Sequence, residues 1–339
     1  MNMRKNLCKA VLGCIFSLAG VLLLSACGSS GASDLHEAEG YYFDTDVELK
    51  INDKNGEALL KKCFSLCEEL ENTFSPSSSS SELYKINRRT SDTVTVSDDM
   101  ADCLEEALTW CSRTDGAFDI TIYPVSSLWD FRSGKTEIPD EAAIDSALAK
   151  VDYTKVHLDG NELTFDSPDT MLDLGGIAKG YASAKIKKML KEEGVSSALI
   201  NLGGNVSTLG LKSSGTKWTV GIQKPFADRG ETLTTVKSSD SCVISAGIYE
   251  RYFEKDGKLY HHILDPKTGY PKETDLNQAT VISTDDAMSD ALSTICILYG
   301  QEKAEEFIKS QGLDVTVLFT DKNNNITWFP EESSDLSAS

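Results

Sequence analysis

The chain has 339 residues, of which 53 are Asp or Glu and 33 are Lys or Arg, so its formal net charge is −20. An acidic body of this kind repels the phosphates of nucleic acid, so we expect no nucleic-acid partner. An anionic ligand would need a metal ion or a local basic patch. Hydrophobic residues make up 40% of the sequence. The roughly 310 residues that follow the first 27 are enough to bury the core of one large domain.

The first residues have the pattern of a secretory signal. Basic residues at Arg4, Lys5 and Lys9 precede an apolar run over residues 10–24, which is short for a membrane span. The run ends in Leu-Ser-Ala-Cys, with the cysteine at Cys27, and this ending resembles the bacterial lipobox. We therefore expect a lipoprotein signal peptide over residues 1–26, lipidation at Cys27 and a flexible tether over residues 27–40. The protein would then be extracytoplasmic and held to a bacterial membrane by its lipid.

The periodicity of the rest predicts one mixed domain of helices and strands, with no repeat and no internal linker. A polar tail follows at residues 331–339. Ser97 is the expected N-cap of one helix, residues 77–81 are expected to be a loop, and residues 114–121 a turn that leads into a short strand. Further helices are expected at 56–70, 98–111, 139–150, 181–190, 286–299 and 302–310, and strands at 41–51, 155–158, 162–165, 198–202, 218–222, 232–236, 242–245, 258–263 and 280–283.

Six cysteines follow Cys27. Most of them occupy apolar positions of segments with helical periodicity, so buried thiols are at least as well supported as disulfides. None of the spacings is that of a zinc site or a redox pair. The six are Cys63, Cys67, Cys103, Cys111, Cys242 and Cys296.

The segment from Leu172 to Tyr181 combines adjacent glycines with one acid, Asp173, and one lysine, Lys179. Glycines allow close approach of the backbone to a ligand, and the helix that follows would present its N-terminus to phosphate. The lysine precedes its glycine, so the segment is neither a P-loop nor a dinucleotide fingerprint. Tight packing alone would explain the glycines equally well. A second glycine turn, Gly203-Gly204-Asn205, suggests another close backbone approach or a plain turn.

Asp290 and Thr294 lie four residues apart on a predicted helix, so their oxygens project from one face. Oxygen ligands of this kind suit Mg²⁺, although a capping acid and a back-bonded threonine would give the same pattern. His261 and His262 follow each other at a strand end, so they point to opposite faces. At most one of them is then expected to act as a general base.

Together these segments resemble the ApbE family of FAD:protein FMN transferases. The resemblance runs from about residue 42 to about residue 328, and it rests on eight short stretches in the same order. They are 81–87, 115–119 (Asp-Gly-Ala-Phe-Asp), 172–181, 200–205 (Ile-Asn-Leu-Gly-Gly-Asn), 221–225, 244–252, 262–271 (His-Ile-Leu-Asp-Pro to Pro) and 290–294.

The resemblance implies an α+β fold, a single ApbE-like (T-fold-like) domain over residues 41–330 with mostly antiparallel sheets and packed helices. It implies that FAD lies between the glycine segment and the histidine turn, with Mg²⁺ at the pyrophosphate. Asp290, Thr294 and the backbone carbonyl of Gly176 would ligate the metal, and His262 would take or relay the proton of the attacking hydroxyl. The residues expected beside the FAD are Phe43, Ser77, Asp119, Asp173, Lys179 and His261.

The activity implied by the resemblance is transfer of FMN from FAD to a Thr or Ser hydroxyl of an exported acceptor protein, with release of AMP. Many relatives carry an aromatic residue where this chain has Ser77, and loss of that ring would weaken stacking on the flavin. The same site could therefore act as a metal-dependent FAD pyrophosphatase, with water as the nucleophile. A flavin-binding or solute-binding lipoprotein without turnover is the alternative from another class.

Overall fold

A computed structural model describes residues 34–331 of the chain. The predicted signal, Cys27 and most of the polar tail lie outside these residues. The helices are α1 (Gly56–Phe74), α2 (Glu82–Ile86), α3 (Asp98–Arg113), α4 (Tyr123–Trp129), α5 (Glu141–Leu148), α6 (Ala178–Glu192), α7 (Asp286–Tyr299) and α8 (Gln301–Gln311), with 3₁₀ turns at Ile120–Ile122 and Tyr153–Lys155. Within this part of the chain, no helix is both long and apolar enough to cross a membrane.

The centre of the molecule is an eight-stranded sheet in which every neighbouring pair is antiparallel. The expected α+β class with mostly antiparallel sheets is therefore confirmed. In spatial order the strands are β1 (Leu35–Tyr42), β2 (Thr45–Asn52), β6 (Ala198–Leu202), β7 (Asn205–Leu209), β10 (Cys242–Gly247), β13 (Leu276–Ser283), β14 (Thr316–Asp321) and β15 (Ile326–Phe329).

Three small sheets surround the central one. They are formed by β3 (Thr93–Thr95) with β5 (Glu162–Phe165) and β4 (Val156–Asp159), by β8 (Trp218–Gln223) with β9 (Thr232–Ser238), and by β11 (Tyr252–Lys255) with β12 (Lys258–His261).

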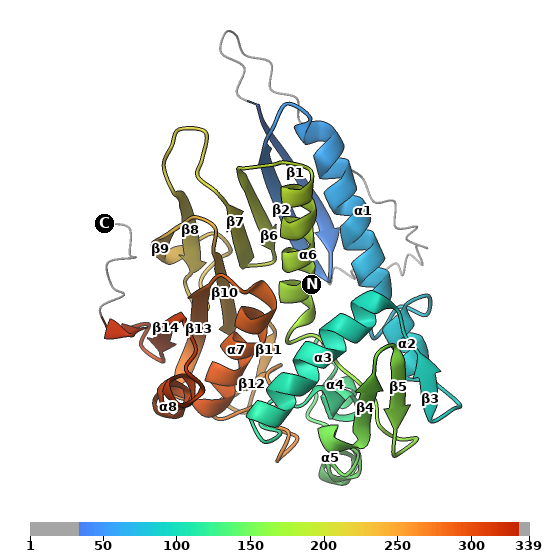
Figure 1. Ribbon diagram of the computed structural model, residues 1–339. Coiled ribbons are helices and arrows are strands. Elements are labelled where there is room, and N and C mark those ends of the chain that lie inside the picture. The colour runs from blue at the N-terminus through green and yellow to red at the C-terminus, as the bar shows by residue number, and fades with distance from the viewer. Residues whose placement is uncertain (1–33, 332–339) are drawn as a thin grey trace, which may run out of the picture.

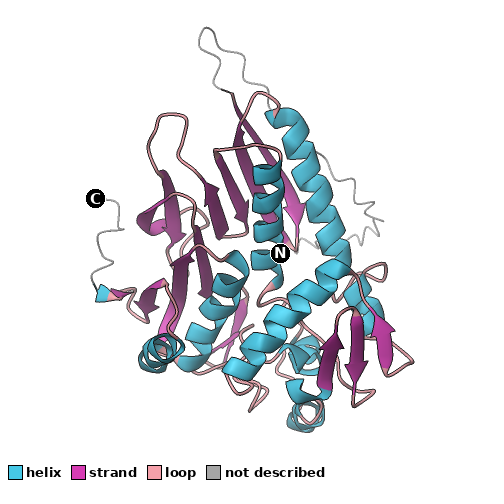
Figure 2. Cartoon of the chain, in the orientation of Figure 1, coloured by secondary structure: helices cyan, strands magenta, loops and turns pink. Residues whose placement is uncertain are grey.

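Alternation along the strands gives the central sheet two apolar faces. Ala198, Ile200 and Leu202 of β6 join the main core with helices α1, α6 and α7, whereas Leu199, between the first two, joins a second core beneath β8 and β9. This is the period of two that a strand requires when both faces are covered. Figure 1 and Figure 2 show the three helices lying across one face of the sheet.

The first strand was predicted wrongly. Residues 41–51 form a hairpin rather than one strand, because Phe43 and Asp44 both adopt positive φ, at 55° and 56°, and reverse the chain between β1 and β2. Non-glycine residues are uncommon in this region, so alternation alone does not reveal such a turn. Since β1 begins at Leu35, the last part of the expected tether, residues 35–40, belongs to the folded domain instead.

Other boundaries also differ from the expectation. The predicted strand near residue 120 is a 3₁₀ turn, because the carboxylate of Asp119 accepts hydrogen bonds from the backbone N–H and the hydroxyl of Thr121 and so caps a helical turn. Helix α6 begins at Ala178 rather than Tyr181. The predicted N-cap at Ser97 is confirmed by its hydrogen bond from the Met100 N–H. All six described cysteines are free and buried.

Helices α6 and α7 approach unusually closely at Gly180. A Cβ atom added there would lie 2.4 Å from the Asp286 carbonyl oxygen and 2.6 Å from the Asp290 Cβ. The Gly180 N–H donates a 2.8 Å hydrogen bond to Asp290 Oδ2. Only a glycine allows this separation of the two helices.

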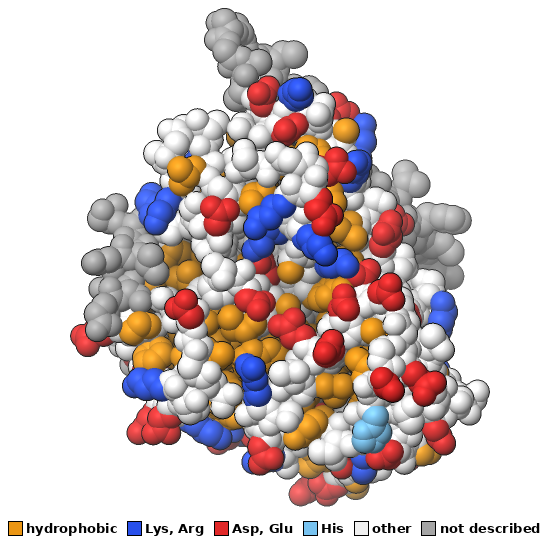
Figure 3. Space-filling model, viewed as in Figure 1, with side chains coloured by type: hydrophobic (Ala, Val, Ile, Leu, Met, Phe, Trp, Pro, Cys, Tyr) orange, Lys and Arg blue, Asp and Glu red, His pale blue; other side chains and the backbone are white. Residues whose placement is uncertain are grey.

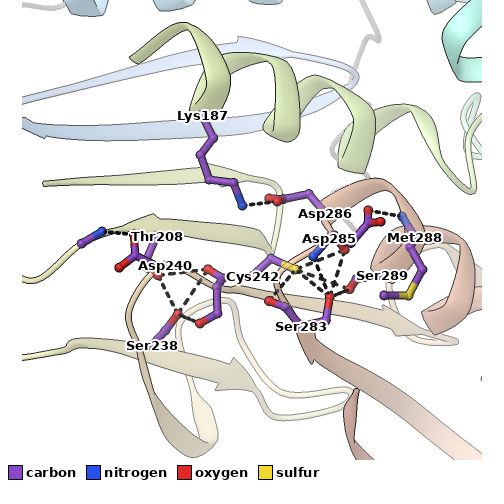
Figure 4. A network of polar contacts seen from close by, with 12 residues as sticks. Lys187, Thr208, Ser238, Asp240, Cys242, Ser283, Asp285, Asp286, Met288 and Ser289 are labelled. Carbon is purple, nitrogen blue, oxygen red and sulfur yellow. Dashed lines mark hydrogen bonds and ion pairs between the residues drawn. The ribbon is translucent and has the colours of Figure 1, made fainter. Parts of the chain in front are cut away.

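Two turns further along α6, the ammonium of Lys187 contacts Asp286 Oδ2 on α7. Figure 4 shows this pair beside a polar cluster of Cys242, Ser283 and Ser289. The Lys187 and Asp286 side chains are only 10% and 1% exposed. The pair and the Gly180 contact together fix how α6 lies against α7.

We expect Lys187→Met to lower the free energy of unfolding by about 3–5 kcal/mol, because it leaves the Asp286 carboxylate buried without its counter-charge. Lys185→Met is the control on the same helix. Lys185 pairs with Asp99 at 2.6 Å, but both side chains are 33% exposed, so the loss should stay below about 1 kcal/mol. Urea unfolding measures both variants, and equal losses would contradict this reading.

Gly180→Ala should destabilise the protein by about 1–3 kcal/mol, although alanine normally favours a helix, because the new methyl group overlaps α7. At Gly175 an added Cβ would meet only Asp173 Oδ1, at 3.1 Å. Gly175→Ala should therefore cost much less. The midpoints of thermal unfolding report the difference, and a more stable Gly180→Ala variant would show that the helices can separate freely.

Candidate active site

A cavity of about 570 Å³ opens where the β1–β2 hairpin, the loop before α6, the end of β10 and helix α7 meet. This volume lies within the range of pockets that hold cofactors and other small molecules. Of the ten residues predicted for the FAD and metal site, nine line the cavity. They are Phe43, Ser77, Asp119, Asp173, Gly176, Lys179, His262, Asp290 and Thr294.

His261 is the exception, and the structure does not place it at the cavity. Its ring is 4% exposed, with Nε2 2.9 Å from the Lys272 carbonyl oxygen and Nδ1 accepting from the Ile263 N–H. These contacts fix the neutral tautomer that carries its proton on Nε2, and burial lowers the pKa of the ring to about 4. His261 thus holds the turn that presents His262, instead of contacting a ligand.

His262 points the other way, into the cavity, as expected for the next residue of a strand end. Its backbone N–H donates to the Arg251 carbonyl, and its Nδ1 has no hydrogen-bond partner among the described residues. Burial, followed by the positive charges of neighbouring groups including Arg251 and Lys179, lowers the pKa of His262 to about 3. The imidazole is therefore neutral near pH 7 and can accept a proton.

Asp290 and Thr294 contribute oxygens to the same end of the cavity. Asp290 is 4% exposed; Oδ2 is held by the Gly180 N–H, and Oδ1 lies 3.6 Å from the Lys179 ammonium. A Cβ atom added to Gly176 would lie 3.7 Å from Thr294 Oγ1, so the Gly176 backbone borders the threonine hydroxyl. A carboxylate, a hydroxyl and a nearby backbone are oxygen donors of the kind that Mg²⁺ prefers.

The charge of the cavity lining also bears on a metal. Seven carboxylates and three cationic side chains line it, which is unfavourable for a diphosphate on its own. Within residues 34–331, no group of three or more His, Cys, Asp or Glu side chains is placed to hold a metal ion. A cation at Asp290 and Thr294 would therefore complete its shell with backbone, water and ligand oxygens, as Mg²⁺ commonly does at phosphates.

Asp119 and Asp173 line the cavity, but their carboxylates are engaged by the protein. Asp119 accepts hydrogen bonds from Thr121 and from the Tyr153 N–H, and burial raises its pKa. The Asp173 carboxylate accepts a hydrogen bond of 2.7 Å from the Ser126 hydroxyl and one of 2.9 Å from the Gly175 N–H. Both acids hold the loops of the wall in place.

Phe43 and Ser77 lie on the side of the cavity formed by the hairpin and the end of α1. The Phe43 N–H donates a 2.8 Å bond to Glu71 Oε1, which stabilises the left-handed turn. The Ser77 hydroxyl lies 3.3 Å from that of Ser75. The wall therefore offers one phenyl ring and a small polar side chain at these positions.

Several lining residues had no role assigned from the sequence. Arg251 lines the cavity, and its Nη2 donates to the Asp44 carbonyl at 3.4 Å, while Arg132 pairs with the Asp44 carboxylate at 3.2 Å. Asn205 is a buried polar lining residue. These residues come from segments far apart in the sequence, so only the folded structure shows that they share one cavity. Asn205 belongs to the glycine turn that the sequence analysis identifies as a possible close backbone approach.

The comparisons with known proteins agree with this geometry. Residues 43–319 match the ApbE family. The chain is 37% identical over 273 residues to the FAD:protein FMN transferase of Klebsiella pneumoniae, covering 80% of this chain and 84% of that protein. It is 31% identical to the enzyme of the same name from Treponema pallidum, covering 91% and 92%.

Solved structures give the same result. The flavin transferase ApbE from Vibrio cholerae superposes with a TM-score of 0.78 at 25% identity, covering 88% of this chain and 97% of that one. The apo flavinyl transferase ApbE from Pseudomonas stutzeri gives 0.79 at 25% identity, covering 90% and 98%. The fold, the sequence match and the position of the cavity lead to one conclusion: this chain belongs to the ApbE family.

Proposed function

We propose that this protein transfers FMN from FAD to a Thr or Ser hydroxyl of an exported acceptor protein, with Mg²⁺ bound at the pyrophosphate, and releases AMP. The chain is a transferase of the FAD:protein FMN transferase type, like its relatives. The observation that carries the finer proposal is the position of Asp290, Thr294 and Gly176 on the wall of the cavity that His262 also lines.

In the proposed reaction, the acceptor oxygen forms a bond to the phosphorus of the FMN half while the bond from that phosphorus to the bridging oxygen breaks. The hydroxyl proton passes to His262, and the bridging oxygen leaves with AMP. Such phosphoryl transfers depend on positioning and charge neutralisation more than on covalent work by the enzyme. A bound Mg²⁺ would offset the charge of the diphosphate.

The low pKa of His262 fits this role. Two of the charges that lower it belong to Arg251 and Lys179, which both line the cavity. A diphosphate bound there would offset these charges, so the pKa of His262 would rise toward its ordinary value when FAD is present. The base is thus neutral before the substrate binds and more basic once it has bound.

The lipid anchor at Cys27 and the extracytoplasmic location belong to the same proposal. They rest on the apolar run and the small residues before Cys27, which lie outside the described residues. An exported, membrane-anchored enzyme would meet exported acceptor proteins. The anchor is tested by measuring how much of the protein is attached to the membrane. Globomycin, and separately Cys27→Ser, should each release the protein from it.

The activity is tested by incubating the purified protein with FAD, Mg²⁺ and a candidate acceptor, then measuring acceptor mass and free AMP. Transfer is supported if the mass of the acceptor rises by that of FMN less one water and AMP is released in equal amount. AMP without modified acceptor would show an FAD pyrophosphatase with water as the nucleophile. Stable FAD with neither product would show a binding protein.

Asp290→Ala should lower turnover about 100-fold or more, because it removes the acidic metal ligand, and even residues that only support such ligands are worth 10–100-fold. Thr294→Val, which keeps the shape but loses the hydroxyl, should raise the Mg²⁺ concentration for half-maximal rate. Thr294→Ser is its matched control and should behave as wild type. Full activity in Asp290→Ala would refute the metal assignment.

The pH dependence should follow the two states of His262. Because its pKa is about 3 without ligand, kcat/KM for FAD should show no loss from His262 protonation between pH 8 and pH 5. kcat reports the enzyme with FAD bound, so its decline at acidic pH should have a higher midpoint pH than the decline of kcat/KM. His262→Gln should lower kcat by roughly 10²–10⁴-fold. The proposed environment of the ring would be contradicted if kcat/KM of the wild type fell on acidification with a midpoint near pH 6.5, and if this fall were absent in His262→Gln.

A further inference from the structure

The turn Gly203-Gly204-Asn205 joins β6 to β7 at the edge of the cavity. Its first glycine has φ of 62°, and a Cβ there would lie 2.2 Å from Thr45 Oγ1. The Gly203 N–H donates a 3.0 Å bond to the Asp46 carbonyl. The glycine is thus required for packing the turn against the β1–β2 hairpin, which carries Phe43.

Asn205 is the last residue of this turn and the first residue of β7. Its side chain is 1% exposed and lines the cavity, yet its Nδ2 has no hydrogen-bond partner among the described residues. Burying an amide without a partner is unfavourable, so most buried polar groups in native proteins are paired. An unpaired amide on a cavity wall therefore indicates a ligand group that completes it.

Two other polar side chains of the same cavity, Ser245 and Lys179, already have partners within the protein. The Ser245 hydroxyl lies 2.8 Å from that of Thr280, and Lys179 faces Asp290. Asn205 is neutral, so it offers directional hydrogen bonds without charge. That is the chemistry that recognises the edge of a planar heterocycle, and Phe43, on the hairpin against which the turn packs, offers an aromatic face to the same cavity.

We propose that Asn205 is a specificity-determining residue of this cavity, whose amide N–H donates to a carbonyl oxygen or ring nitrogen on the edge of a bound heterocycle. This inference rests on the proposed function, which supplies FAD as the ligand. FAD has two such rings, the isoalloxazine and the adenine, and the shared chemistry is an uncharged acceptor on a ring edge. Asn205 does not act on the reacting phosphate.

The test is FAD binding to Asn205→Asp, which keeps the shape but removes the N–H donors, and to Asn205→Leu. Both should raise the Kd for FAD roughly tenfold or more, the loss expected for one hydrogen bond to a buried group. Ser207→Ala is the matched control. Ser207 lies two residues along β7, and its hydroxyl is also buried and unpaired, but it does not line the cavity. Its Kd should stay within about twofold of wild type.

Thermal unfolding separates binding from a structural role. If Asn205 is there for the ligand, Asn205→Leu removes an unpaired polar group, so the ligand-free Tm should not fall, while the rise in Tm on adding FAD should shrink. Competition with FMN and with AMP then identifies the ring, because only the half that Asn205 contacts should bind more weakly to Asn205→Asp.

Three outcomes would overturn the inference. One is a wild-type Kd for FAD in both Asn205 variants. The second is a lowered ligand-free Tm with an unchanged Kd, which would make Asn205 structural. The third is unchanged competition by both FMN and AMP. A wild-type protein that binds no FAD would instead overturn the proposed function itself, so the two failures are distinguishable.

Discussion

The close approach of helices α6 and α7 at Gly180 determines the geometry of the site. The absence of a side chain at Gly180 lets its backbone N–H reach Asp290 Oδ2, which leaves the other carboxylate oxygen directed toward Lys179. The buried Lys187–Asp286 pair fixes the same two helices further along. The proposed metal ligand on one helix and the glycine segment on the other are thereby held in a single arrangement, which is the preorganisation that phosphoryl transfer requires.

Electrostatics imposes a second constraint on the site. The protein is acidic as a whole, and its cavity is lined by more carboxylates than cations. On the face that Figure 3 shows, acidic and basic side chains lie interspersed rather than in separate patches. Binding of an anionic dinucleotide would therefore depend on the few basic groups at the site and on the cation that we propose at Asp290 and Thr294. Burial, together with the charges of those basic groups, holds the pKa of His262 well below its ordinary value.

The sequence was informative where function depends on local spacing. Asp290 and Thr294 share a helix face, and His261 and His262 point to opposite sides, so their relative positions follow from periodicity alone. Three features could not be predicted in this way. The left-handed turn at Phe43 and Asp44 uses no glycine. The second carboxylate oxygen of Asp119 accepts from the Tyr153 N–H of a distant segment, and the Lys187–Asp286 pair joins residues about a hundred positions apart. The last two strands were missed as well. β14 is paired on both sides and residues 317–320 are all buried, so it shows no alternation, whereas β15 is a short and partly exposed edge strand.

The function that we propose requires one cavity to hold FAD together with a divalent cation at Asp290 and Thr294. Its most direct measurement is a crystal structure of the protein with FAD and Mn²⁺, using anomalous scattering to locate the metal. We expect a manganese peak beside Asp290 and Thr294, with the diphosphate of FAD in its coordination shell and His262 in the same cavity. FAD bound outside this cavity, or a diphosphate in it with no metal at these two residues, would refute the proposed site.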